Sequence, residues 1–239
     1  MLSFAVFDKE VGMSIHRLGA LALVIGSVLV TGTAQAALSS FNSKAAFDAA
    51  VASLSAAQTV DFDSTLAGTT FASGTGTGGL SFTYSIVGPS TLQVSDTFGT
   101  TSGSNYLGLD NPDTAFYLGD SFTINFNRTV HAVGLYLVAG RDAQAGDMEL
   151  QVAGGSVFNS GSADRTLSDG QAYYLGLVES DAGAGFTSAT VRGIVSQNAF
   201  LAFTADDITS AVSAVPEPAS WGLMLVGLGA LCGLARSRH

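Results

Sequence analysis

Hydrophobic residues follow two different patterns along the chain. Two uninterrupted apolar runs lie near the ends, from Leu18 to Val30 and from Ala219 to Ala235. Between them, apolar side chains mostly recur at every second residue, which is the period of a half-buried β-strand. The two ends and the middle of the chain are therefore interpreted separately.

One stretch of the middle part has a helical period instead. In residues 41–54, Phe47, Val51 and Leu54 fall on one helical face. Asn42 or Ser43 could cap the start of this helix. We expect a short N-terminal helix that packs against one end of a sheet.

The rest of the middle part predicts strands. Two segments, 120–126 and 131–140, place apolar residues at alternating positions: Phe122, Ile124, Phe126, Val133, Leu135 and Leu137. Clusters of Gly, Ser, Asp and Asn separate further candidates, which are TVDFDS, GLSFTYSIVG, SNYLGLD, DMELQVAG, AYYLGLVES, FTSATVRGI and AFLAFTADDIT. This pattern predicts a mostly β fold, an antiparallel two-sheet β-sandwich of jelly-roll type.

The first apolar run has the layout of a secretory signal peptide. It follows Met13 and the basic residue Arg17, and Ala34 and Ala36 come after it in an A-x-A arrangement. We expect cleavage between Ala36 and Ala37, so that residues 1–36 are removed, and we take Met13 as the true start. A permanent membrane anchor is the alternative, but the short run and the cleavage site favour a signal peptide.

The second apolar run, residues 219–235, predicts a transmembrane helix. Its seventeen uncharged residues are close to the lower limit for a membrane span, and Arg236 and Arg238 follow on what would be the cytoplasmic side. Pro216 and Pro218 interrupt helical structure just before the span, which leaves Glu217 in extended backbone at the outer surface. A membrane-bound processing enzyme could reach it there.

Taken together, these C-terminal features resemble the PEP-CTERM sorting signal of Gram-negative bacteria that make exopolysaccharide. The resemblance covers residues 215–239 and rests on Val215-Pro216-Glu217-Pro218, the apolar span and the terminal arginines Arg236 and Arg238. It implies recognition by exosortase, an integral membrane cysteine protease or transpeptidase. A plain tail anchor behind a proline-containing linker is the alternative.

The resemblance also implies a route for the protein. The Sec translocon and signal peptidase would export residues 37–214, the C-terminal helix would anchor them transiently, and their destination would be the cell surface or the extracellular matrix. The 37–214 part itself resembles the jelly-roll-like domains of unknown function that often precede such tails. The chain thus divides into a signal peptide (1–36), an exported domain (37–214) and a sorting signal (215–239).

The exported domain is strongly acidic. It holds five Lys and Arg residues against sixteen Asp and Glu residues, a net charge of minus eleven. This balance argues against nucleic acid and against direct contact with anionic polymers. The chain's single cysteine, Cys232, lies in the second apolar run, so the exported domain has neither a disulfide nor a cysteine-ligated metal.

Catalytic motifs are missing their usual context. GTGTGG at 74–79 precedes a strand-like segment rather than a helix, so we expect a loop and not a nucleotide site. His131, the exported domain's one histidine, is expected at the surface or at a strand edge, and its two glutamates, Glu149 and Glu179, are far apart in sequence. We therefore expect no catalytic residues and no enzymatic activity.

Calcium is the one candidate cofactor. Asp61 and Asp63 alternate on an early predicted strand, and Asp206 and Asp207 lie at the end of the last one. Terminal strands of a sandwich often lie side by side, and carboxylates brought together there would suit Ca²⁺, which takes six to eight oxygen ligands. The alternative is that all four carboxylates simply face solvent on alternating strand positions.

Three classes of function remain open. The first is a structural or adhesive β-sandwich that acts in the extracellular polysaccharide of a biofilm. The second is a calcium-dependent carbohydrate-binding module, and the third is a hydrolase. Six tyrosines could stack on sugar rings, although aromatic residues in strands more often pack in the core: Tyr84, Tyr106, Tyr117, Tyr136, Tyr173 and Tyr174.

Overall fold

The computed structural model describes residues 38–55, 57–153, 155, 157–179, 185–194 and 201–213. The chain divides into two units, Met1–Ala34 and Gln35–His239, and every described residue belongs to the second. The predicted signal peptide with its cleavage site, the sorting signal and the span 219–235 lie outside the described residues. None of the helices in the described part is long and apolar enough to cross a membrane.

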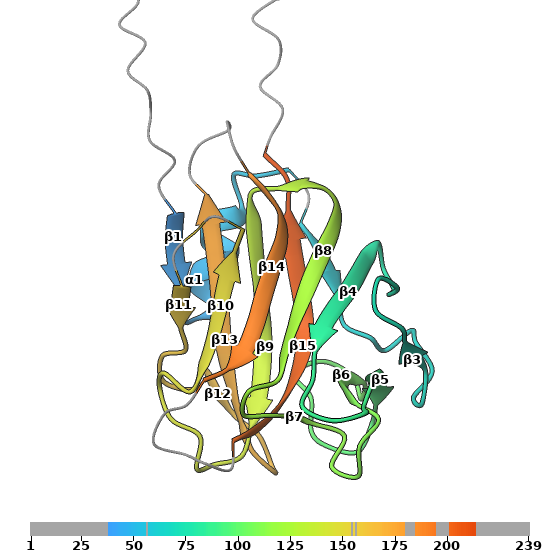
Figure 1. Ribbon diagram of the computed structural model, residues 1–239. Coiled ribbons are helices and arrows are strands. Elements are labelled where there is room, and N and C mark those ends of the chain that lie inside the picture. Colours follow the sequence, from blue (N-terminus) through green and yellow to red (C-terminus); the bar gives the residue numbers. More distant parts are fainter. Residues whose placement is uncertain are drawn as a thin grey trace, which may run out of the picture. The chain divides into compact units, whose positions relative to one another are not determined.

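Two antiparallel sheets and one helix make up the described structure, as predicted (Figure 1). One sheet has ten strands, of which seven follow one another in the order β1 (Leu38–Phe41), β13 (Gln171–Glu179), β9 (Ala132–Ala139), β15 (Ala202–Ala211), β6 (Tyr106–Leu109), β5 (Leu92–Ser95) and β3 (Thr70–Phe71). Its other strands are β12 (Arg165–Thr166), which pairs with β13, and β2 (Gln58–Val60) and β7 (Phe116–Tyr117), which both pair with β15. The second sheet runs β11 (Val157–Asn159), β10 (Met148–Val152), β14 (Phe186–Gly193), β8 (Ser121–Val130) and β4 (Leu80–Ser85).

The main core lies between the two sheets. The residues predicted to point inward from segments 120–126 and 131–140 all belong to it, which confirms the alternating pattern. Three aromatic rings join the sheets: Phe116 stacks on Phe122 with 4.9 Å between ring centroids, and on Phe203 with 5.3 Å. Offset stacking of this kind adds to the apolar burial that holds sandwiches together.

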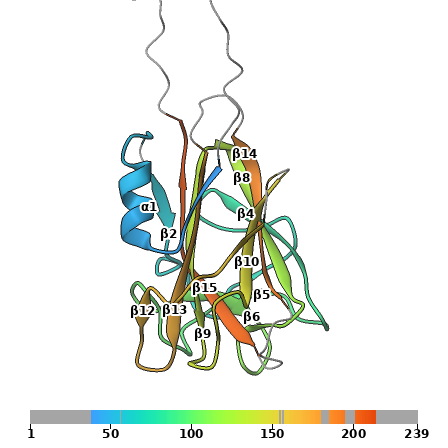
Figure 2. The ribbon, with the colours of Figure 1, turned by 90° about the vertical axis from the view of Figure 1, so that its left-hand side faces the viewer.

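Helix α1 (Lys44–Val51) covers the outer face of the ten-stranded sheet (Figure 2). Its buried residue Phe47 packs over Gly134 of β9 and Gly176 of β13, which are directly paired across the two strands. A Cβ atom at Gly176 would lie 2.5 Å from a ring carbon of Phe47, so the absence of side chains at this glycine pair is what lets the helix dock. Strand β9 is consequently buried on both faces along its whole length.

Two local predictions around the acidic residues were wrong. Strand β2 ends at Val60, and Phe62 has a φ of 62°, so Asp61 and Asp63 lie in a turn rather than on a strand. At the other position, Asp206 and Asp207 lie in the middle of β15 and not at its end. The register of β15 on β9 shifts between Asp206 and Thr209, as expected for a β-bulge.

Candidate binding site

The loop between β5 and β6, residues 96–105, is held mainly by carboxylates from distant parts of the chain. Asp206 accepts hydrogen bonds from the backbone nitrogens of Thr101 (2.9 Å) and Ser102 (3.2 Å) and from the Thr101 hydroxyl (2.9 Å). Asp207 accepts a second contact with the same hydroxyl at 2.9 Å. The two aspartates at the β15 bulge therefore bind the middle of the loop.

Two further carboxylates hold the ends of this loop. Asp63 Oδ1 accepts from the backbone nitrogens of Ser104 (2.8 Å) and Asn105 (3.0 Å). Asp169 Oδ2 accepts from the backbone nitrogen of Gly99 at 2.7 Å. Backbone donors that a short loop would otherwise leave to water are thus paired with charged acceptors, which make the stronger kind of hydrogen bond.

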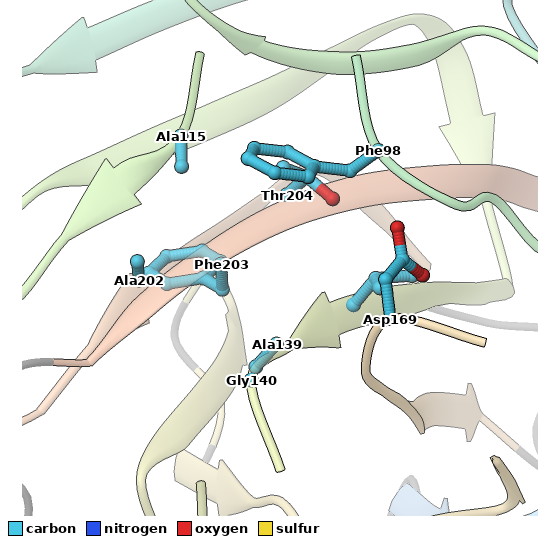
Figure 3. Close-up of a pocket in the computed structure, with 9 residues that line it drawn as sticks. Phe98, Ala115, Ala139, Gly140, Asp169, Ala202, Phe203 and Thr204 are labelled. Atoms are coloured by element: carbon cyan, nitrogen blue, oxygen red, sulfur yellow. The ribbon is translucent and has the colours of Figure 1, made fainter. Parts of the chain in front are cut away.

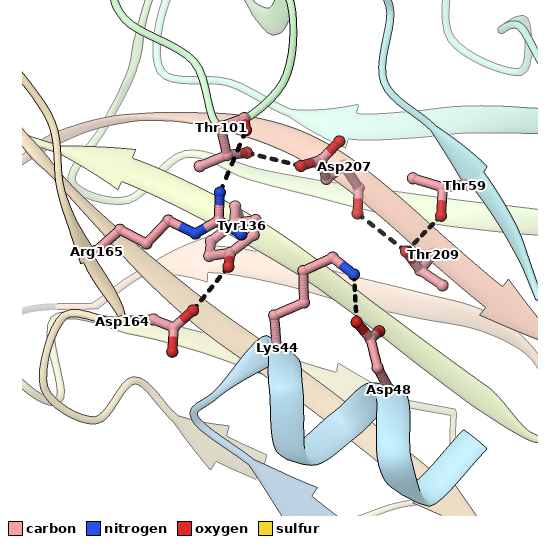
Figure 4. Close-up of polar contacts among 9 residues, drawn as sticks. All are labelled: Lys44, Asp48, Thr59, Thr101, Tyr136, Asp164, Arg165, Asp207 and Thr209. Carbon is pink, nitrogen blue, oxygen red and sulfur yellow. Dashed lines mark hydrogen bonds and ion pairs between the residues drawn. The ribbon is translucent and has the colours of Figure 1, made fainter. Parts of the chain in front are cut away.

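Strand β12 adds a basic contact to the loop (Figure 4). The Arg165 guanidinium donates to the Thr101 carbonyl at 3.3 Å and lies 4.7 Å from the ring centroid of Tyr136. The Tyr136 hydroxyl in turn donates to Asp164 at 2.7 Å. These contacts fix the loop to the sheet and extend its polar network to β9.

Burial sets the electrostatics of Asp206. The residue is fully buried, and desolvation, followed by repulsion from Asp207, raises the pKa of its carboxyl to about 6. Hydrogen bonds from Thr101 and from the Asp207 backbone nitrogen act in the opposite direction and limit the rise. Near pH 6 the Asp206 carboxyl therefore changes its protonation state while it holds the loop.

The four aspartates predicted to bind calcium do not meet in one cluster. Among the described residues, no group of three or more His, Cys, Asp and Glu side chains is placed to hold a metal ion. The Asp61 carboxylate accepts a hydrogen bond from the Asp63 backbone nitrogen at 3.2 Å, while Asp63, Asp206 and Asp207 bind separate points of the 96–105 loop. Calcium binding therefore stays a prediction from the sequence.

Next to this loop lies a pocket of about 200 Å³ (Figure 3). The start of β15 and the end of β9 form most of it, and Phe98 of the loop and Asp169 complete it. Its apolar lining consists of Ala115, Val138, Ala139, Ala202 and Phe203, with Gly140 beside them. The pocket is thus apolar inside, with an aromatic ring and a carboxylate at its walls.

Phe98 and Thr204, which both line the pocket, differ in their exposure. Phe98 is 42% exposed, although it stacks on Tyr106 with ring centroids 6.4 Å apart. Thr204 is only 3% exposed, and its hydroxyl has no hydrogen-bond partner among the described residues. An unpaired buried hydroxyl is costly. The Thr204 hydroxyl oxygen is also covered by protein atoms, so a ligand in the pocket does not contact it.

The tyrosines predicted as sugar-stacking candidates do not form this site. Tyr106, Tyr136, Tyr173 and Tyr174 are buried, and of the six only Tyr117 reaches 36% exposure. Sequence reasoning missed Phe98, Asp169 and Thr204. The available signal was an aromatic residue in a loop otherwise rich in Gly, Ser and Thr, where no strand pattern explains its presence.

The predicted position of His131 at the surface or at a strand edge was wrong. Only 8% of the residue is exposed, because its backbone pairs with Ala211 on one side and Glu179 on the other. Its Nδ1 accepts from the Ser213 backbone nitrogen at 3.0 Å. Of the two glutamates, Glu149 forms an ion pair with Arg192 on the neighbouring strand β14.

Comparison with known proteins identifies the C-terminal end of the chain. The PEP-CTERM protein-sorting motif matches residues 214–238. The chain carries a PEP-CTERM sorting signal. The resemblance drawn from the sequence is thereby confirmed for this end of the chain, and the motif implies export and a membrane-associated sorting step. No curated protein matches the chain.

Several solved structures are similar to the chain, at low identity. The cleaved K2 adhesin domain of Lys-gingipain shares 15% identity with a TM-score of 0.42, over 66% of this chain and 99% of that one. The C-terminal family 22 carbohydrate-binding module of Clostridium thermocellum Xyn10B (15% identity) and a xylan-binding domain of the same family (16% identity) each have a TM-score of 0.36, over 68% of this chain and 96% of theirs. The fold class rests on the two sheets themselves.

Proposed function

We propose that this protein is exported, processed by exosortase, and acts at the cell surface or in the extracellular matrix as a structural or adhesive β-sandwich. The observation that carries the proposal is the sorting motif at 214–238, which begins three residues after the end of β15 at Ala211. The folded part and the signal are therefore almost directly joined. Exopolysaccharide of a biofilm is the proposed environment.

Contact rather than catalysis is the proposed mode of action. The net charge of minus eleven over residues 37–214 opposes direct attraction to acidic polymers, which leaves neutral glycans or acidic glycans bridged by calcium. Among the groups that a hydrolase could use, Glu149 pairs with Arg192 and His131 Nδ1 accepts from a backbone nitrogen. His131 Nε2 and Glu179 Oε2 have no hydrogen-bond partner among the described residues, but both atoms are buried away from solvent. A calcium-dependent carbohydrate-binding module is the second candidate, because the pocket beside Phe98 is the kind of concavity a small ligand fills.

Processing in an exosortase-bearing host tests the sorting part of the proposal. We expect the intact mass of the mature protein to show a start near Ala37 and loss of residues 219–239, because both ends carry cleavable signals. Replacing Pro216-Glu217-Pro218 by alanines should leave export unchanged and block removal of the tail. A wild-type protein that keeps residues 219–239 would refute exosortase processing.

Matrix association tests the adhesive part. Fractionation of cultures should place the processed protein with the extracellular polysaccharide, and purified protein should show no turnover of polysaccharide, ester or peptide substrates. If the purified wild-type protein shows turnover and the His131→Ala variant does not, hydrolysis replaces adhesion as the proposed function. The alanine variant is informative because His131 is the only histidine in residues 37–214.

A further inference from the structure

We propose that the pocket beside Phe98 binds one neutral sugar residue that carries a methyl group, either an N-acetyl hexose or a 6-deoxy hexose. The inference rests on the proposed function, since it names the glycan that the exported domain would contact. It is argued from the size of the pocket, the groups in its walls and the charge around it.

Size limits the ligand to a single residue. At about 200 Å³, the pocket is smaller than the roughly 300–1,000 Å³ typical of sites for drug-sized ligands. Its walls are alanines, a valine and phenylalanines, so what enters most deeply must be apolar. A methyl group of an acetyl or 6-deoxy substituent satisfies this condition, whereas the hydroxymethyl group of glucose would place a hydroxyl against apolar walls.

The carboxylate in the pocket wall matches a sugar rather than a purely apolar ligand. The Thr204 hydroxyl has no hydrogen-bond partner among the described residues, but it is covered by protein atoms and does not face the ligand. Asp169 uses Oδ2 to hold Gly99, which leaves Oδ1 as an acceptor for a sugar hydroxyl. A hydrocarbon chain would offer no donor to this oxygen.

Phe98 supplies the stacking surface, and the carboxylates behind the loop position it. The apolar CH face of a sugar ring packs well on an aromatic ring, and Phe98 is exposed enough to offer one side of its ring. Because Asp169 binds Gly99 and Asp206 binds Thr101, the backbone next to Phe98 is fixed before any ligand arrives. Such preorganisation lowers the entropic cost of binding.

Charge makes the site selective for neutral sugars. No Lys or Arg is among the residues that line the pocket, while Asp169 is. A uronic acid would therefore meet a like charge in the pocket wall, while the guanidinium of Arg141, next to Gly140, donates to the Ser168 carbonyl at 3.1 Å. A free amino sugar would instead be attracted to Asp169, and this class is separated from the proposed one by the experiment below.

Saturation-transfer NMR on the purified full chain in detergent tests the proposal. The probes are N-acetylglucosamine, L-rhamnose, D-glucose, glucosamine and glucuronate. We expect transfer to N-acetylglucosamine or L-rhamnose, strongest at the methyl protons, and weaker or no transfer to the other three. No transfer to either methyl-bearing sugar, or stronger transfer to glucosamine or glucuronate, overturns the proposal.

Four variants locate the binding. Phe98→Ala removes the stacking face, and Ala202→Leu fills the pocket from the partly exposed start of β15; each should weaken binding by at least about tenfold. Thr204→Val keeps the shape but removes a covered, unpaired hydroxyl, so it should leave binding unchanged and should not lower the melting temperature. Leu66→Ala is the matched control, because Leu66 is 81% exposed and lies outside the pocket. Unchanged binding in Phe98→Ala and Ala202→Leu would place the sugar elsewhere and refute the assignment.

The sugar-binding experiment and the matrix experiment test two separate claims, and either claim can be refuted without the other. A protein that stays with the extracellular polysaccharide in culture but binds neither methyl-bearing sugar refutes this pocket and leaves the proposed function standing. A protein that binds the sugar as described but is recovered free of the matrix refutes the adhesive function and leaves the pocket standing.

Discussion

Replacing Asp206 by asparagine should flatten the dependence of stability on pH. Burial and the neighbouring Asp207 raise the pKa of the Asp206 carboxyl from 3.8 to about 6. The folded chain therefore holds this proton more tightly than the unfolded chain does. The contribution of Asp206 to stability is complete below about pH 4 and is lost as the pH rises through about 6.

The magnitude follows from the size of the shift. A rise of about two pKa units, at about 1.36 kcal/mol for each unit, corresponds to about 3 kcal/mol between the two ends of this pH range. Asparagine keeps one acceptor oxygen for the amide donors of Thr101 and Ser102 but cannot ionise. The substitution should therefore change the free energy of unfolding by the same amount at every pH, whereas the contribution of the wild-type Asp206 changes with pH.

Urea unfolding followed by far-ultraviolet circular dichroism measures this effect at a series of pH values from about 4 to about 7. The difference in free energy of unfolding between Asp206→Asn and wild type removes the contributions of the other acidic groups. It should move in favour of the variant by up to about 3 kcal/mol as the pH rises. If the difference stays constant over this pH range, the reasoning is refuted. Asp63→Asn is the control, because Asp63 also holds the loop but is exposed. If Asp63→Asn shows an equal change with pH, the effect comes from the loop and not from the burial of Asp206.

Two further predictions concern calcium and the helix. We expect calcium chloride to raise the melting temperature, chelator to reverse the rise, and Asp207→Asn to remove it, because a bound cation would relieve the repulsion between Asp206 and Asp207; a melting temperature indifferent to calcium and chelator would reject the metal. Gly176→Ala should cost about 1–3 kcal/mol in urea unfolding, since its Cβ would lie 2.5 Å from the Phe47 ring, and adding Phe47→Leu should recover part of the loss. Unchanged stability of Gly176→Ala would show that the helix does not depend on the glycine pair.

The alternating pattern predicted the fold class because it records burial on one face at a time. It identified the inward residues of β8 and β9 correctly. It did not anticipate that β9 is buried on its other face as well, because that depends on the docking of Phe47 over paired glycines from two strands. Strands as short as β3 and β7 carry too few positions for any period to be recognised.

The candidate site was less accessible from the sequence. Its predicted neighbourhood was partly right, since β2 does pair with β15, with Val60 opposite Ile208. The carboxylates, however, bind backbone nitrogens, which every residue except proline offers, together with Thr101 and Ser102 hydroxyls of a kind that is common in loops. Asp206 and Thr101 are 105 residues apart. Local patterns contain no information about such a contact.

Strand β15 begins at Ala202 in the wall of the pocket and ends at Ala211, three residues before the sorting motif. While the proposed transient anchor is attached, a ligand held at the pocket would therefore load β15 along its length of about 30 Å, with the end of β9 sharing the load at the pocket. Antiparallel hydrogen bonds stand perpendicular to such a pull. The bonds from β15 to β9 on one side, and to β2, β6 and β7 on the other, would then have to shear together instead of opening one after another. Such a geometry would suit the adhesive role proposed above, in which the domain would have to keep its fold while it is loaded.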